Sequence, residues 1–175
     1  MKHPLRVLTL ACALVSVGAL AGKVVGEQAG DKQLKTRVEA ALSDHAATGV
    51  HVEVYRGLVQ LSGFVASDAE RETAYQLASI INGVKQVRDQ LAVQASKRDG
   101  QQVADDALVA NTVRSRLDDN DGTNGRDIKV NVREGVVLLS GFVRTDDERR
   151  EAVKTAQAVQ GVISVINGMD LLPLG

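Results

Sequence analysis

The stretch GLVQLSGFVASDAERETA, residues 57–74, returns 78 positions later as GVVLLSGFVRTDDERREA, residues 135–152. The match extends without a gap from 54–93 to 132–171, and 16 of these 40 positions are identical. A period of this length is that of a small domain and is too long for a solenoid unit. We therefore predict two domains, residues 31–94 and 105–173, joined by a polar linker over residues 95–104.

Each copy predicts the same order of elements. Leu34, Val38 and Leu42 recur every four residues behind Asp31, an N-cap candidate, and this spacing is typical of an amphipathic helix. Two segments of alternating apolar residues follow, joined by a tight turn at Arg56 and the next glycine, and they predict a β-hairpin. The fold class is thus α+β, with two small domains of order helix-strand-strand-helix-strand, each a three-stranded sheet covered by two helices.

The second helix of each copy begins with a capping-box pattern, a hydroxyl residue followed three positions later by glutamate, at Ser67/Glu70 and Thr145/Glu148. Strand parity points Gly63 inward, and we expect it to let the small residues of this helix approach the sheet closely. The residues that mark turns, helix ends and thin points of the sheets are Gly57, Gly63, Gly83, Gly135, Gly141, Gly161 and Asn167.

The N-terminus has the pattern of a secretory signal: Lys2 and Arg6, then an apolar run over residues 7–20, then a small residue at Ala21. We expect cleavage after Ala21 and export to the periplasm. Cys12, the single cysteine, lies inside this run, so the exported chain is expected to form no disulfide.

The composition argues against a nucleic-acid partner. The formal net charge is −1, and aromatic residues make up 2% of the chain. Neither a basic stripe for phosphates nor a stacking platform for bases is evident.

Several of these motifs together resemble the BON domain. They are the Gly-x-Val-x-Leu-x-Gly pattern at 57–63 and 135–141, the helix after it, and the strand ending Val-x-Asn-x-Met at 165–169, where the first copy has Asp89 in place of the asparagine. Tandem copies behind a signal sequence resemble the osmotically inducible, OsmY-like periplasmic proteins. The resemblance implies a role in envelope maintenance under stress, with no catalysis and no cofactor. It also implies binding to phospholipid surfaces or, alternatively, chaperone-like binding of unfolded clients.

Candidate catalytic or metal-ligating groups are few. His45 and His51 are interpreted as surface residues, and Ser62 and Ser140 lack the strand-to-helix elbow of a nucleophile. The acidic loop over residues 118–127 favours a solvated turn over a Ca²⁺ site. A metal-binding or catalytic role is thus the weakest interpretation.

A binding surface is the remaining hypothesis. By parity Phe64 and Phe142 face away from the helices, onto a sheet face that is either open or buried between the two domains. Basic residues on the first helix of each copy are suited to lipid phosphates. The predicted surface for anionic phospholipid, or for envelope client proteins, comprises Lys32, Lys35, Arg37, Arg114, Arg116, Phe64 and Phe142.

Overall fold

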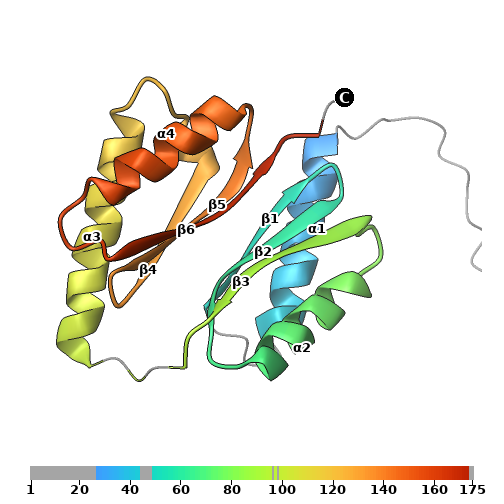
Figure 1. The fold of residues 1–175 in the computed structure, drawn as a ribbon. Helices are drawn as coiled ribbons and strands as arrows, with labels where there is room; N and C mark the ends of the chain where they lie inside the picture. The colour runs from blue at the N-terminus through green and yellow to red at the C-terminus, as the bar shows by residue number, and fades with distance from the viewer. Residues whose placement is uncertain (1–26, 44–48, 96, 98, 174–175) are drawn as a thin grey trace, which may run out of the picture.

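The computed structural model describes residues 27–43, 49–95, 97 and 99–173, so the predicted signal sequence and His45 lie outside the described residues. The two domains have the same order of elements (Figure 1). The first consists of α1 (Glu27–Ser43), β1 (Val50–Tyr55), β2 (Leu58–Val65), α2 (Asp68–Ser79) and β3 (Gln86–Val93). The second consists of α3 (Gly100–Asp118), the 3₁₀ turn η1 (Gly125–Asp127), β4 (Ile128–Arg133), β5 (Val136–Val143), α4 (Asp146–Gln157) and β6 (Ser164–Leu171).

Each domain is built on a three-stranded sheet with its longest apolar strand in the centre. β2 pairs antiparallel with β1 and parallel with β3, and β5 pairs in the same way with β4 and β6. The parallel pairing requires a crossover, which α2 and α4 provide. The predicted α+β fold class is confirmed.

The hairpin turn is held by the first helix. Arg56 (φ 51°) and Gly57 (φ 81°) both have positive φ, as a two-residue type I′ turn requires. The Asp31 carboxylate accepts hydrogen bonds from the Arg56 and Gly57 amides at 2.5 and 2.9 Å. Since α1 begins at Glu27, the prediction that Asp31 is the N-cap is wrong. Asp106 on α3 does the same for the second hairpin, accepting from Glu134 and Gly135 at 3.0 Å each.

Gly63 and Gly141 have a different role from the predicted one. Both have positive φ, 122° and 112°. A Cβ on Gly63 would lie 1.9 Å from the Gly49 carbonyl oxygen, and one on Gly141 would lie 2.1 Å from the Asp127 carbonyl oxygen. The glycines therefore accommodate the backbone that leads into the first strand, and not a close helix. Parity alone could not reveal this, because the clash comes from a chain segment some 14 residues away.

Helix capping confirms the predicted cap at Ser67 and shows where α3 begins. The Ser67 hydroxyl accepts from the Glu70 amide at 3.2 Å, while the Glu70 carboxylate accepts from Ala66, one residue before the cap. Helix α3 begins at Gly100, inside the predicted linker, because Asp99 and Gln102 form a reciprocal capping box.

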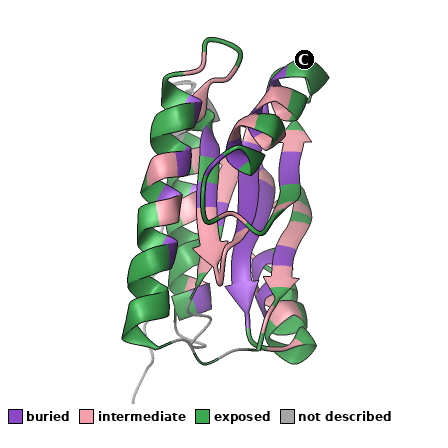
Figure 2. Cartoon of the chain, turned by 60° about the vertical axis from the view of Figure 1, so that its left-hand side comes forward, coloured by how far each residue is buried: buried purple, intermediate pink, exposed green. Residues whose placement is uncertain are grey.

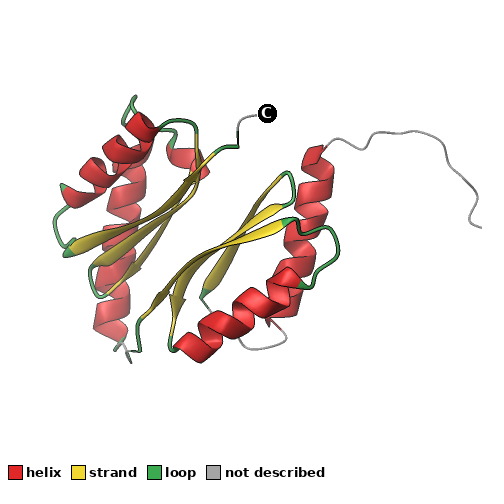
Figure 3. Cartoon of the chain, turned by 45° about the vertical axis from the view of Figure 1, so that its right-hand side comes forward, coloured by secondary structure: helices red, strands yellow, loops and turns green. Residues whose placement is uncertain are grey.

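The two domains pack with their sheets face to face and their helices outside, so the layers run helices, sheet, sheet, helices (Figure 3). Each domain keeps its own apolar core between sheet and helices. Buried residues are concentrated along the strands, and the outer helix surfaces are exposed (Figure 2). The sheet face turned away from the helices is therefore an interface between domains, which was one of the two alternatives that the sequence left open.

Candidate functional site: a charged cleft between the two domains

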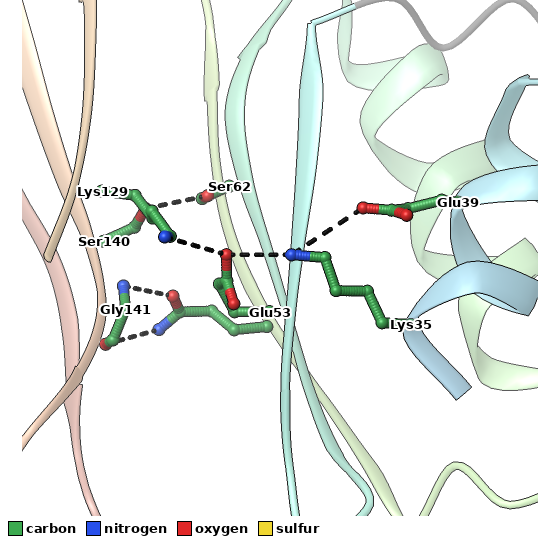
Figure 4. Close-up of polar contacts among 8 residues, drawn as sticks. Lys35, Glu39, Glu53, Ser62, Lys129, Ser140 and Gly141 are labelled. Atoms are coloured by element: carbon green, nitrogen blue, oxygen red, sulfur yellow. Dashed lines mark hydrogen bonds and ion pairs between the residues drawn. The ribbon is translucent and has the colours of Figure 1, made fainter. Parts of the chain in front are cut away.

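The domain interface has an approximate twofold relation. Ser140 donates a hydrogen bond to Ser62 at 2.9 Å, and these two serines occupy equivalent positions in the two copies (Figure 4). Gly168 lies against Gln90, its own equivalent on β3. Equivalent residues meet only near an axis that exchanges the two domains, so the interface is built like that of a symmetric dimer.

Gln60 makes this interface unequal. Its side chain is fully buried, at 0% exposure, and its counterpart in the second domain is Leu138. The Gln60 amide nitrogen donates to the Gly168 carbonyl at 3.0 Å and to the Asp170 carboxylate at 2.7 Å, and its oxygen accepts from the Gly141 amide at 2.6 Å. One side chain of the first domain thus satisfies polar groups on two strands of the second.

The two phenylalanines of the predicted surface lie at the domain interface. Phe64 is 9% exposed and is not available to a lipid or a client while the domains are docked. Phe142 is half-buried, and its ring lies 5.8 Å from that of Tyr55 in the other domain.

On one side of the interface the edge strands β1 and β4 border a cleft of about 370 Å³. Helix α1 forms one wall, and α3 with η1 forms the other. The cleft is lined by Lys35, Glu39, His51, Val52, Glu53, Arg114, Asp118, Gly125, Arg126, Ile128, Lys129, Val130 and Asn131. Two further hollows share Glu53 with the cleft, and the three together are called the groove.

The carboxylate of Glu53 is held between two lysines from different domains. Its oxygen lies 3.1 Å from the Lys35 ammonium nitrogen and 3.7 Å from that of Lys129, and Lys35 is also 3.9 Å from Glu39 (Figure 4). These ion pairs involve two of the carboxylates in the cleft, Glu39 and Glu53. Four cationic side chains and three carboxylates line it, which leaves one net positive charge.

The two arginines of the cleft have no carboxylate partner among the described residues. Arg114 donates to the Val130 carbonyl at 2.8 Å and to the Asn111 side chain at 2.9 Å, both neutral acceptors. Arg126 lies on η1, in the segment that is three residues longer in the second copy than in the first. Thr123 fixes this segment to α3 by donating to the Leu117 carbonyl at 2.6 Å.

His51 lies on β1 between these groups. Partial burial lowers the pKa of its imidazole below the usual 6.5, and the positive charges of Lys35 and Arg114 lower it further. Glu53 and Glu39 oppose the shift without cancelling it. The imidazole is therefore neutral at pH 7.

The structure brings together part of the predicted surface. Lys35 and Arg114 line the same cleft, and Lys32 lines the adjoining hollow with Tyr55. Arg37 and Arg116 are exposed on their helices outside these hollows. Sequence reasoning missed Arg126 and Lys129 as site residues. The break in the repeat at residues 118–127 was the available signal, because extra residues in one copy often carry a role that the other lacks.

The two candidate serines meet at the domain interface. Ser62 and Ser140 are buried and bond to each other. Among the described residues no three histidine, cysteine, aspartate or glutamate side chains gather as metal ligands. None of the described helices is long and apolar enough to cross a bilayer.

Residues 30–95 and 105–173 both match the BON domain. The chain belongs to the BON-domain family. It is similar to the osmotically-inducible protein Y of Escherichia coli K12, at 35% identity over 149 residues, covering 83% of this chain and 74% of that protein. It is also similar to the outer membrane lipoprotein DolP of Haemophilus influenzae, at 32% identity over 88% of this chain and 84% of that one.

Among solved structures, CdsD, a structural protein of the type III secretion system of Chlamydia trachomatis, matches 81% of this chain and 93% of its own at 15% identity. The TM-score is 0.36.

The first BON domain departs from the family pattern at Asp89, where the second has Asn167. Asp89 accepts a hydrogen bond from the Leu91 amide at 3.0 Å, and Asn167 accepts from Met169 at 3.1 Å. In both strands the side-chain oxygen accepts a hydrogen bond from the amide two residues later. Asp89 in addition pairs with Arg71 at 2.7 Å, so the substitution leaves the fold of the domain intact.

Proposed function

We propose that this tandem BON-domain protein is a non-catalytic component of the bacterial periplasm that supports the cell envelope under stress. The predicted signal sequence and the similarity to the osmotically-inducible protein Y and to an outer membrane lipoprotein support this location and role. We further propose that it attaches peripherally to anionic phospholipid surfaces.

The observation that carries the lipid proposal is the placement of cationic side chains around one groove. Lys32 and Lys35 from α1 and Arg114 from α3 border hollows that share Glu53, although they come from different domains. Arg126 and Lys129 add two more cations at the same place. Basic side chains gathered at the junction of two domains attract lipid phosphates by charge, a force screened within about 8 Å at physiological salt.

Co-sedimentation with vesicles tests the proposal. The purified protein is mixed with phosphatidylglycerol-containing vesicles or with purely zwitterionic ones, each at low and at high salt. Binding is expected only to the anionic vesicles and is expected to fall with salt. The charge reversals Lys32→Glu and Arg126→Glu are expected to weaken it, because both side chains line the groove. Lys154→Glu, on α4 away from the groove, serves as the matched control.

Absence of binding under every condition would refute membrane attachment. Binding that persists at high salt and is equal for zwitterionic vesicles would refute its electrostatic basis.

Chaperone-like binding of unfolded clients is the alternative. The sheet faces that sequence reasoning offered to clients are packed against each other, with Gln60 and Leu138 fully buried. A holdase that used them would have to separate its domains. Suppression of client aggregation at high salt, combined with loss of the Ser62–Ser140 contact, would favour this function over the lipid proposal.

A further inference from the structure

We propose that the inter-domain cleft is a binding site for a single phosphate group, held by the guanidinium groups of Arg114 and Arg126. The proposal deepens the function above, on which it rests for the source of the phosphate, a lipid headgroup. A soluble phosphomonoester offers the same chemistry, and the experiment separates the two sources.

Neither arginine of the cleft is neutralised by a carboxylate of the described residues. Guanidinium groups pair with carboxylates or phosphates through two parallel hydrogen bonds, and they retain their charge at any physiological pH. Arg114 has only neutral acceptors, and Arg126 makes no ion pair or hydrogen bond among the described residues. Two guanidinium groups without a counter-ion at one cleft are suited to an anion of two charges.

Two of the three carboxylates of the cleft lie near its lysines. Glu53 is shared by Lys35 and Lys129, and Glu39 also lies near Lys35. These two carboxylates are therefore already matched by the two lysines. Asp118 alone remains, and its carboxylate lies against the backbone at Gly125, where a Cβ would come within 2.3 Å of its oxygen. One carboxylate against two arginines leaves the arginine end of the cleft positive.

The residues that line the cleft also include neutral hydrogen-bond donors. A neutral imidazole at His51 presents one N–H to a ligand and adds no charge of its own. The Asn131 side-chain nitrogen, in the wall of the same cleft, has no hydrogen-bond partner among the described residues. This nitrogen is buried, and a buried donor without a partner favours a ligand whose acceptor oxygens it meets by a turn of the side chain, such as those of phosphate.

The cleft is lined by residues of both domains. Arg114 and Arg126 belong to the second domain, whereas His51 and Lys35 belong to the first. A ligand that contacts both walls binds only the docked arrangement and therefore stabilises it by mass action. Phosphate binding and domain docking are thus expected to strengthen each other, in equal measure by linkage.

The probe for the test is glycerol phosphate, with glycerol as the uncharged control. We expect saturable changes in the amide resonances of η1 and β4 and in the His51 ring resonances, together with a rise in the His51 pKa on binding. The variant Arg126→Gln is expected to lower the affinity about tenfold or more, the effect of one charge-assisted hydrogen-bonded pair. Because the Arg126 side chain makes no hydrogen bond or ion pair with the described residues, this variant is expected to unfold at the wild-type temperature.

Arg116→Gln is the matched control, since Arg116 is an exposed arginine of the same helix as Arg114 but lies outside the cleft. Equal loss of affinity in both variants would overturn the cleft as the site, as would resonance changes that do not saturate or that spread over the surface.

The vesicle experiment separates this proposal from the proposed function. Vesicle binding without glycerol phosphate binding would overturn the cleft and leave membrane attachment standing. Glycerol phosphate binding without vesicle binding would support the cleft as a site for a soluble phosphomonoester and refute membrane attachment.

Discussion

Replacing Gln60 by leucine tests whether one buried amide holds the two BON domains together. Leucine is the residue at the equivalent position of the second domain, Leu138, so it fits a strand of this kind. The variant loses the bonds to the Gly168 carbonyl, the Asp170 carboxylate and the Gly141 amide. We expect the domains to lose docking free energy while each keeps its own core.

The magnitude follows from the groups left without partners. A buried donor or acceptor stranded by a substitution costs about 1–3 kcal/mol, and the Gly141 amide and the Gly168 carbonyl are two such groups. Burial of the leucine methyl groups returns about 1 kcal/mol. The net expectation is a loss of about 3 kcal/mol in the free energy of unfolding of the docked protein.

Urea unfolding followed by circular dichroism measures this loss, and native-state hydrogen exchange of the Gly141 amide locates it. In the variant this amide is expected to exchange faster by about a hundredfold, the factor that corresponds to 3 kcal/mol. Gln76→Leu is the control, because Gln76 is exposed on α2 and its side chain bonds to Glu72 on the same helix. An unchanged unfolding midpoint with a protected Gly141 amide would refute the role assigned to Gln60.

Three further outcomes are expected. Gly63→Ala should cost at least about 2 kcal/mol of stability, because φ is positive there and the new Cβ would clash with the Gly49 carbonyl. Gly30→Ala is the control: it lies in open space on α1 and should be neutral or stabilising. Equal thermal midpoints of the two variants would contradict this. Asp106→Ala should cost about 1–3 kcal/mol by releasing the second hairpin turn, with the exposed Asp105→Ala near wild type in the same urea titration. The folded pKa of His51 lies below its unfolded value of 6.5, so the unfolded chain binds more protons between the two values and stability falls as pH drops through this window. His51→Asn should reduce this fall as the pH drops below about 6.5, and an identical pH profile would refute the shift.

The sequence determined the fold of each domain because its signals are local. The apolar spacing of Leu34, Val38 and Leu42, the turn at Arg56 and the cap at Ser67 act within a few residues, and the repeat states them twice. Local propensity and the global fold agree at these positions, as they do in sequences that specify one structure.

Residues whose partners are distant in sequence were interpreted wrongly or missed. Asp31 has the pattern of an N-cap, yet its carboxylate binds a turn 25 residues later. Gly63 has inward parity, yet the reason for a glycine is the carbonyl of Gly49. Neither partner can be found by periodicity, which reports only which face a residue occupies.

What the sequence determined by itself, then, is two copies of one α+β domain, their family and the basic residues on their first helices. What only the tertiary structure decided is how the copies meet. Ser62 and Ser140 have a nearly identical local sequence, and nothing local says that they bond to each other. The cleft with Arg114, Arg126 and His51 exists only because the sheets pack face to face and set β1 beside β4. This long-range arrangement depends on the fit of two surfaces, and the periodicity of neither sequence copy predicts it.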